Sequence, residues 1–218
     1  MKKQTGATLI SLLIGLVIAM FCILAILSSY RTVVKTGVES RIAATHDTEL
    51  QSGLTAAQMF LQNAGFGLDG ANHFLITDMQ IESNNLSVVL WRYNNGSKVI
   101  CEGLADAESG DKKKRRLVFL EGLSDESGSP CNSTLSLGAF KWKVKSTLAN
   151  LEDYSADKSN PKQIMFKQTA LACSPYGAGD ADETTPHPLI TIEAQTSTQK
   201  LAGLEKVQIP VCLLNIAS

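Results

Sequence analysis

The sequence lacks the residue patterns from which common catalytic sites are built. It contains no H-E-x-x-H, no G-x-S-x-G, no G-x-x-x-x-G-K-[ST] and no G-x-G-x-x-G that opens a helix. The three histidines, His46, His73 and His187, are scattered along the chain, and we expect ordinary surface residues rather than metal ligands. These absences predict a protein that is not an enzyme and that uses no metal and no cofactor.

An excess of charge of either sign is also missing. The 218 residues include 20 Lys and Arg and 21 Asp and Glu, so the formal net charge is −1. This balance excludes a basic nucleic-acid-binding domain and an acidic disordered tail. Hydrophobic residues make up 44% of the chain, but a block of them lies at the N-terminus. The remainder, roughly residues 30–218, suits one globular domain.

The five cysteines show no C-x-x-C and no spacing typical of a zinc site. Cys22 lies inside the N-terminal hydrophobic run, where we interpret it as a small apolar side chain. The other four lie beyond that run, and their even number predicts disulfides formed in an oxidising compartment. Of the three possible connectivities we favour Cys101–Cys131 with Cys173–Cys212, because these pairs close the smaller loops.

Charged residues are absent from residues 7–27, a run of about 21 residues that as a helix would rise about 30 Å, the thickness of a bilayer core. A removable secretory signal is shorter and ends in an A-x-A-like site, which LAILSSYR does not supply. Lys2 and Lys3 precede the run and favour a cytoplasmic N-terminus. The sequence therefore predicts a retained membrane helix, with the rest of the chain on the outer side.

Proline is absent from residues 28–63, so we expect the same helix to continue through Leu61, weakened only by Gly37 and Gly53. Apolar positions in this part form two sets on roughly opposite faces. The first set is Tyr30, Val33, Val34, Gly37, Val38 and Ala44, and the second is Leu50, Leu54, Ala57, Leu61 and Ala64. We expect the second set to pack on the chain's own sheet and the first on other subunits. A plain amphipathic helix with irregular patterning is the alternative.

Beyond Gly67 the hydrophobic period changes from that of a helix towards that of strands. Residues 86–93, the turn Asn94-Asn95-Gly96 and residues 98–101 predict a β-hairpin. Further strands are predicted at residues 116–120, 139–144, 164–173, 189–194 and 207–214. No helices separate these strands, so we predict a largely antiparallel sheet and an α+β fold.

Residues 6–14 read Gly6-Ala7-Thr8-Leu9-Ile10-Ser11-Leu12-Leu13-Ile14 after a short basic leader. This run resembles the type IV prepilin signature, and residues 55–66 are similar to the helix end of PilW-type minor pilins. The resemblance implies a pilin-like fold, in which a long N-terminal helix packs on an antiparallel sheet. It also implies that a prepilin peptidase cuts between Gly6 and Ala7 and methylates the new amino group of Ala7.

The same resemblance divides the chain into four parts: a leader (1–6), a transmembrane and filament-core helix (7–29), its amphipathic continuation (30–66) and a periplasmic β-rich domain (67–218). It implies an inner-membrane protein that becomes extracellular in a pilus. The implied partners are other minor pilins, the major pilin, the peptidase, the inner-membrane assembly platform and, before assembly, membrane lipid.

Two positions depart from the family pattern. Ala7 stands where phenylalanine is usual, and Ser11 where glutamate is usual. In the family that carboxylate pairs with the amino terminus of an assembled subunit, and unpaired it would cost about 2.5–3.5 kcal/mol in a membrane. A subunit at the filament tip has no predecessor, so Ser11 leads to the hypothesis of a tip or initiation role. The alternative is that Ser11 is tolerated in a low-abundance subunit.

The leading hypothesis is thus a minor type IV pilus subunit, and three alternatives stay open. The first is a pseudopilin of a type II secretion system, and the second is a DNA- or surface-binding subunit presented on the pilus. The third is an unrelated single-span periplasmic protein with a signal anchor.

Two clusters of charged residues could bind a ligand. Lys112, Lys113, Lys114, Arg115 and Arg116 would attract nucleic-acid phosphates, although a solvated loop is favoured. Residues 177–183 hold three carboxylates among glycines, for which a flexible acidic loop is favoured over a calcium site.

Overall fold

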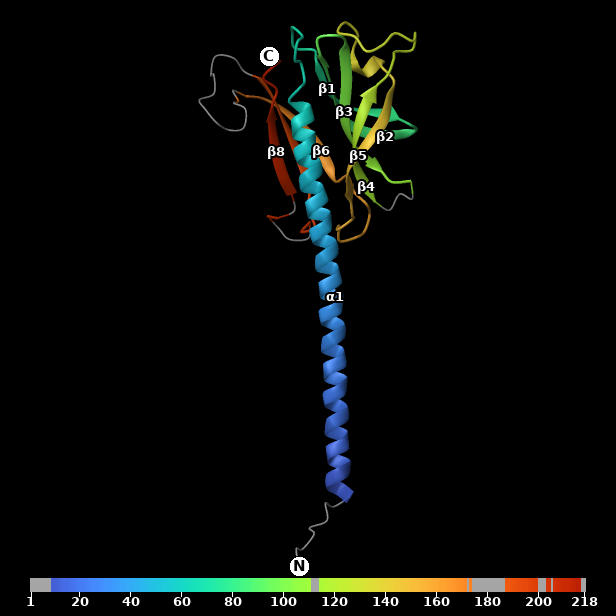
Figure 1. Ribbon diagram of the computed structural model, residues 1–218, viewed down its shortest axis with the longest axis vertical. Helices are drawn as coiled ribbons and strands as arrows, with labels where there is room; N and C mark the ends of the chain where they lie inside the picture. The colour runs from blue at the N-terminus through green and yellow to red at the C-terminus, as the bar shows by residue number, and fades with distance from the viewer. Residues whose placement is uncertain are drawn as a thin grey trace, which may run out of the picture. The chain divides into compact units, whose positions relative to one another are not determined.

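The computed structural model describes residues 9–110, 114–171, 173, 187–199, 203–204 and 206–216 (Figure 1). Within these residues one α-helix precedes two groups of strands. The elements are α1 (Leu9–Leu61), β1 (Phe74–Ile81), β2 (Asn84–Asn94), β3 (Val99–Glu108), β4 (Arg115–Gly122), the short 3-10 helix η1 (Leu137–Ala139), β5 (Trp142–Leu151), β6 (Ile164–Leu171), β7 (His187–Gln195) and β8 (Lys206–Cys212).

The strands form two antiparallel sheets. Strands β1 to β5 pair in sequence order as a five-stranded meander, and β6, β7 and β8 form a second sheet of three strands. This confirms the predicted α+β class and the hairpin across Asn94-Asn95-Gly96, which joins β2 to β3.

Several strand predictions need correction. The strand predicted at residues 98–101 continues to Glu108, and those predicted to end at residues 173 and 214 end at Leu171 and Cys212. Strand β1 was missed, because it lies at the sheet edge, is mostly half-exposed and therefore lacks a clean apolar alternation. The strand predicted at residues 139–144 begins only at Trp142 and runs to Leu151, since residues 137–139 form η1.

The middle strands of the five-stranded sheet, β2 to β4, are buried on both faces. On one face Val89, Trp91 and Leu104 join a core shared with α1 and the three-stranded sheet. On the other face Val88 and Leu90 join a second core, closed by Leu137, Phe140 and Trp142 from the segment between β4 and β5. Because alternate residues face different cores, the middle strands are buried almost continuously.

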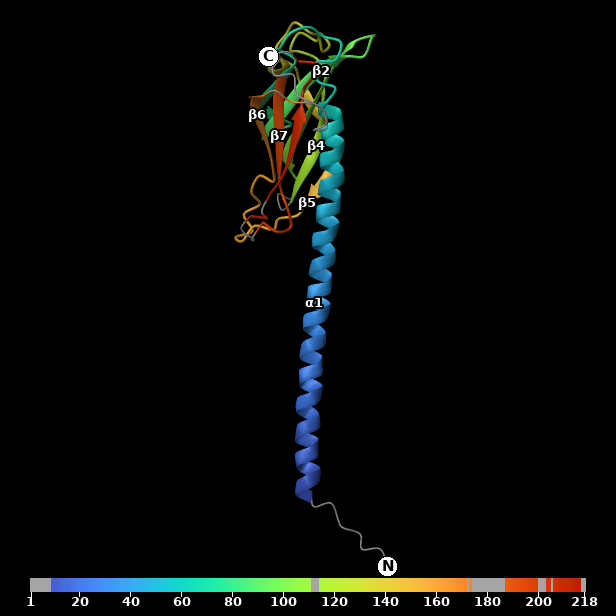
Figure 2. The same ribbon diagram turned by 90° about the vertical axis from the view of Figure 1, so that its left-hand side faces the viewer.

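The chain divides into two compact units, Met1–Ala44 and Thr45–Ser218. In the first, the described residues 9–44 are helical throughout. In the second, the remainder of α1 lies against both sheets (Figures 1 and 2). Its buried apolar residues are Leu50, Leu54, Ala57 and Leu61, which confirms the prediction that this set packs on the chain's own sheet.

Two glycines fit α1 to the sheets. A Cβ on Gly53 would lie 2.8 Å from Ala149 Cβ and 3.2 Å from the Leu148 carbonyl oxygen, so glycine lets the helix approach β5 closely. Gly65 follows the helix with a φ of +79°, a left-handed conformation that suits glycine. Its amide donates to the carbonyl of Arg92, which links the helix exit to β2.

Two disulfides brace the strands, with the predicted connectivity. Cys101–Cys131 ties β3 to the segment between β4 and β5, and Cys173–Cys212 ties a residue two positions after β6 to the end of β8. In each pair the Cα atoms lie 5.9 Å apart. The first disulfide joins cysteines 30 positions apart and the second joins cysteines 39 positions apart. Both closed loops restrict the unfolded chain.

Candidate functional site

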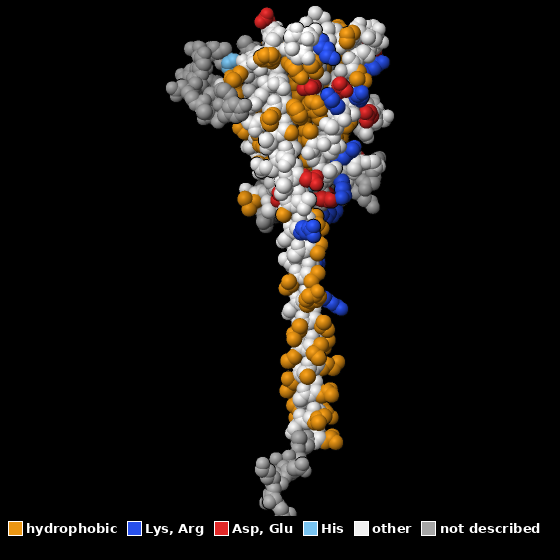
Figure 3. Space-filling view, viewed as in Figure 1, with side chains coloured by type: hydrophobic (Ala, Val, Ile, Leu, Met, Phe, Trp, Pro, Cys, Tyr) orange, Lys and Arg blue, Asp and Glu red, His pale blue; other side chains and the backbone are white. Residues whose placement is uncertain are grey.

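Most of the exposed large hydrophobic side chains among the described residues lie on residues 9–42 of α1 (Figure 3). Hydrophobic side chains there are 41–79% exposed. They are Leu9, Ile10, Leu12, Leu13, Ile14, Leu16, Val17, Ile18, Met20, Phe21, Ile23, Leu24, Ile26, Leu27, Tyr30, Val33, Val34, Val38 and Ile42. We call this set the exposed helix surface. Water disfavours so much apolar area, so lipid or other helices must cover it.

The described chain has one helix that is long and apolar enough to cross a membrane, and it is α1. About 20 residues suffice for a bilayer core, yet apolar residues continue beyond Leu27. Tyr30, Val33, Val34 and Val38 belong to the first predicted apolar set and are all exposed. The two sets therefore have different environments, as predicted. Packing of the first set on other subunits stays a prediction.

The processing residues Gly6 and Ala7 lie outside the described residues. Ser11, the position that is usually glutamate in the resembled family, lies in the first turn of α1 and is exposed. Its hydroxyl-bearing side chain adds no charge to this part of the surface.

The helix is fixed to both sheets by the polar stretch that follows the exposed helix surface. Asp47 accepts hydrogen bonds from the amide and hydroxyl of Ser197, just after β7, at 2.9 and 2.5 Å. Glu49 Oε2 accepts from the amide of Asn150 in β5 at 3.1 Å. Because these bonds reach elements of two sheets, they set the rotation of this part of the helix about its axis.

His46 belongs to the same polar stretch and is only 2% exposed. Its Nδ1 accepts the amide hydrogen of Glu152 at 3.0 Å, and its ring meets Tyr154 edge to face at 5.1 Å between centroids. Burial lowers the pKa of His46, while the Asp47 carboxylate and the Gln195 carbonyl act in the opposite direction.

The expectation of surface histidines is wrong for His46 and His73, which is 5% exposed. His73 Nε2 lies 2.8 Å from the Asp69 carbonyl, and Nδ1 lies 3.2 Å from Arg92 Nε. His187 is half-buried, with Nδ1 2.9 Å from the Ile216 carbonyl. Each ring satisfies backbone groups of the fold, a role that scattered single histidines do not reveal in a sequence.

The basic cluster does not form one solvated patch. Lys112 and Lys113 lie outside the described residues, and Lys114 Nζ lies 2.5 Å from Glu152 Oε1. Arg116 is half-buried and donates to the Glu108 carbonyl at 3.4 Å.

Arg115 overturns the expectation of a solvated residue most clearly, because it is only 6% exposed. Its Nε lies 2.7 Å from Asp106 Oδ1 and its Nη1 3.2 Å from Glu108 Oε1. Asp106 Oδ2 also accepts the amides of Gln163 and Ile164, at 2.6 and 3.0 Å. The buried charge thus links β3, β4 and the start of β6, and Arg115 does not present its charge to a phosphate.

Metal-binding residues do not gather within the described ranges, where no group of three His, Cys, Asp or Glu side chains could hold an ion. The acidic residues 177–183, weighed above as a calcium site, lie outside those ranges. Comparison of the chain with protein-family models, curated proteins and solved structures gives no match. A function must therefore be argued from this chain's own residues.

Proposed function

We propose that the chain is a minor subunit of a type IV pilus that helps to start or cap the filament. The observation that carries this proposal is the division of α1 into two parts. Residues 45–61 bury Leu50, Leu54 and Ala57 within the chain's own core, whereas residues 9–42 keep their apolar side chains exposed. A helix with this division is suited to lie first in a membrane and then among the helices of other subunits.

The length of the exposed helix surface favours a filament over a plain anchor. A membrane anchor needs about 20 apolar residues, which residues 7–27 already supply. Tyr30, Val33, Val34, Val38 and Ile42 lie beyond that length and are 45–69% exposed. Apolar residues past the membrane serve an anchor poorly but are what helix packing between subunits requires.

The location we propose is the inner membrane, with a cytoplasmic N-terminus and a periplasmic C-terminal domain. Lys2 and Lys3 support this orientation, because basic residues stay on the cytoplasmic side. The disulfides Cys101–Cys131 and Cys173–Cys212 support it independently, since disulfides persist in oxidising compartments.

The processing step gives the decisive test. We would express the native gene in cells that contain a prepilin peptidase and analyse the N-terminal peptide by mass spectrometry. The expected peptide starts at methylated Ala7. A Gly6→Val variant in the same cells is the control and should keep Met1. If the unaltered chain also starts at Met1, or is cut near Ser28, the filament proposal fails.

Two further measurements separate the related systems and test the tip role. Deletion of the gene should abolish surface pili and twitching, whereas loss of protein secretion would assign the chain to a type II secretion system. A Ser11→Glu variant tests the tip hypothesis, because it restores the carboxylate that pairs internal subunits. Reduced filament number or loss of tip location supports the hypothesis. Unchanged filament number together with unchanged tip location contradicts it.

A further inference from the structure

A cavity of about 320 Å³ opens beside β1 and β2, where the segment that follows Cys131 crosses the five-stranded sheet. Arg92 of β2 forms part of its wall, together with Phe74 and Leu137. The polar side chains Asn72, Thr134 and Ser136 also line it and are exposed at its rim. The cavity therefore combines one cation, three neutral polar groups and apolar walls.

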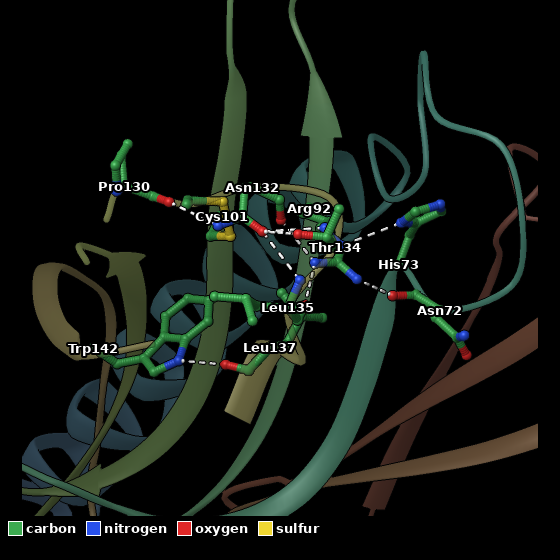
Figure 4. The surroundings of a disulfide bond; sticks show 11 residues. Asn72, His73, Arg92, Cys101, Pro130, Asn132, Thr134, Leu135, Leu137 and Trp142 are labelled. Carbon is green, nitrogen blue, oxygen red and sulfur yellow. Dashed lines mark hydrogen bonds between the residues drawn. A yellow bond between two sulfur atoms is a disulfide. The ribbon is translucent and has the colours of Figure 1, made fainter. Parts of the chain in front are cut away.

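The guanidinium of Arg92 is buried, with the residue 2% exposed, and it binds only neutral groups (Figure 4). Its Nη1 donates to the carbonyls of Asn132 and Leu135, at 2.7 and 2.6 Å. Its Nη2 donates to the carbonyl of Asn72 at 2.6 Å, and its Nε to His73 Nδ1 at 3.2 Å. A guanidinium has five N–H donors. Within the described residues four are used, which leaves one N–H on Nη2.

Arg115 shows how this chain treats a buried arginine elsewhere. Its guanidinium is paired with the carboxylates of Asp106 and Glu108. Arg92 has no carboxylate within ion-pairing distance in the described parts of the chain, and burial lowers its pKa. A buried cation without a counter-charge is costly. The difference between the two arginines leaves the Arg92 site able to accept an anion from outside the fold.

The other side chains that line the cavity indicate the charge and shape of the anion that would fit. Ser136 Oγ accepts the amide of Gly138 at 3.4 Å, so its own hydrogen can be donated into the cavity. Asn72 meets Arg92 through its backbone carbonyl, and its side-chain amide points away from the guanidinium (Figure 4). One guanidinium N–H with one neutral hydroxyl donor suits a monoanion, and Phe74 and Leu137 suit a short hydrocarbon chain.

We propose that this cavity binds the carboxylate of a small acid with a short apolar chain, through the remaining Nη2 hydrogen of Arg92. The same chemistry occurs in a free acid and in the C-terminal residue of a peptide. The proposal concerns the β-rich unit alone and does not depend on how the N-terminal helix is used.

The test is a calorimetric titration of the full chain in detergent micelles, with 4-methylpentanoate as the free-acid probe and N-acetylleucine as the peptide-end probe. Saturable binding of either one supports the proposal, and the tighter of the two identifies the source. The matched control is 4-methylpentanamide, which keeps the shape and lacks the charge. Equal binding of acid and amide, equal binding of inorganic phosphate, or no binding of either acid would overturn the proposal.

Two variants at the cavity rim test the site without replacing Arg92, whose loss could unfold the protein. Thr134→Asp places a carboxylate at the exposed cavity rim next to Arg92, whereas Thr134→Asn has nearly the same shape without charge. We expect Thr134→Asn to keep acid binding and Thr134→Asp to weaken it at least about tenfold, because the new carboxylate competes for Arg92 and repels the ligand. The Nε–H resonance of Arg92 should shift on acid binding in the Asn variant. Equal affinities of the two variants would contradict the assignment.

Discussion

Residues 9–44 and 45–61 belong to one helix of 53 residues, yet their apolar side chains have different surroundings. In residues 45–61 one face is buried against two sheets. His46 and Asp47 make hydrogen bonds to residues just after β5 and β7, and Glu49 makes one to a residue within β5. In residues 9–44 apolar side chains such as Leu16 and Val33 are more than 60% exposed. An unbroken helix therefore does not imply a uniform environment along it.

The difference also separates two uses of hydrophobic residues. Apolar residues of the C-terminal part stabilise the folded chain, because the fold itself removes them from water. Apolar residues of the N-terminal part add nothing to the stability of the chain alone and instead favour lipid or another helix. The same substitution made in each part should therefore change the stability of the folded chain differently, and equal effects would contradict this distinction.

Truncation of a leucine to alanine should give the largest difference in free energy of unfolding between the two parts of α1. Leu54 is 1% exposed in the core, whereas Leu16 is 64% exposed. Leu54→Ala should lower the free energy of unfolding by about 2–5 kcal/mol, through lost burial and a new cavity. Leu16→Ala should change it by less than about 0.5 kcal/mol. Urea unfolding of the full chain in micelles, followed by fluorescence of the buried Trp91, measures both.

Equal losses for Leu54→Ala and Leu16→Ala would contradict the division of α1. A matched loss would mean that residues near Leu16 are covered within the folded chain. A small loss for both would mean that the second apolar set contributes little to the core.

Replacing glycine by alanine should change the free energy of unfolding by less, and with opposite sign in the C-terminal and N-terminal parts of α1. At Gly53 a new Cβ would lie 2.8 Å from Ala149 Cβ and 3.2 Å from a backbone oxygen, neither of which can rotate away. The crowding should destabilise the fold by about 1–3 kcal/mol, outweighing the helix propensity of alanine. At Gly37 nothing lies within 4 Å of the added Cβ. Gly37→Ala should therefore be neutral or stabilise by up to about 1 kcal/mol.

Thermal unfolding of both glycine variants, monitored by circular dichroism in the same micelles, measures the two signs. A stabilising Gly53→Ala would show that α1 does not approach β5 as closely as the contacts with Ala149 and Leu148 imply.

The sequence predicts well those features that depend on neighbouring residues. The proline-free stretch gives the length of α1, Asn94-Asn95-Gly96 gives the hairpin of β2 and β3, and helical spacing gives the buried set that includes Leu50 and Leu54. The disulfide pairing followed from the smaller loops, which also join segments close in sequence.

Features that depend on distant residues could not be predicted. Strand β1 is an edge strand whose pattern is weak, and β6 pairs with β7 and not with β5, a choice of neighbour that no local pattern encodes. The run of basic residues resembled a solvated loop, because the partner of Arg115 is Asp106, nine residues earlier and on another strand. The amide that donates to buried His46 belongs to Glu152, more than a hundred residues away.

The smallest effect is expected from pH, and it should act on the C-terminal part of α1 alone. His46 is the first histidine of the chain, so residues 9–44 contain none. Burial lowers its pKa in the folded state below the ordinary value of 6.5, despite the carboxylates of Asp47, Glu49 and Glu152 nearby. The neutral ring is also the form that accepts the Glu152 amide through Nδ1. Folding therefore favours the unprotonated ring.

The sign follows from proton binding in the two states. Between pH 6.5 and the lower folded-state pKa, the unfolded chain binds more protons at His46 than the folded chain, so stability falls as the pH falls through this window. The stabilisation is complete above pH 6.5 and is lost at and below the folded-state pKa.

His46→Asn isolates this contribution, because the asparagine Oδ1 can replace Nδ1 as acceptor for the Glu152 amide but does not titrate. We expect the free energy of unfolding of the unaltered chain, relative to His46→Asn, to fall as the pH is lowered from 7.5 to 5, because groups common to both chains cancel in the difference. Urea titrations at several pH values measure this difference. A constant difference, or one that grows at acidic pH, would show that His46 is not held neutral where α1 meets the sheets.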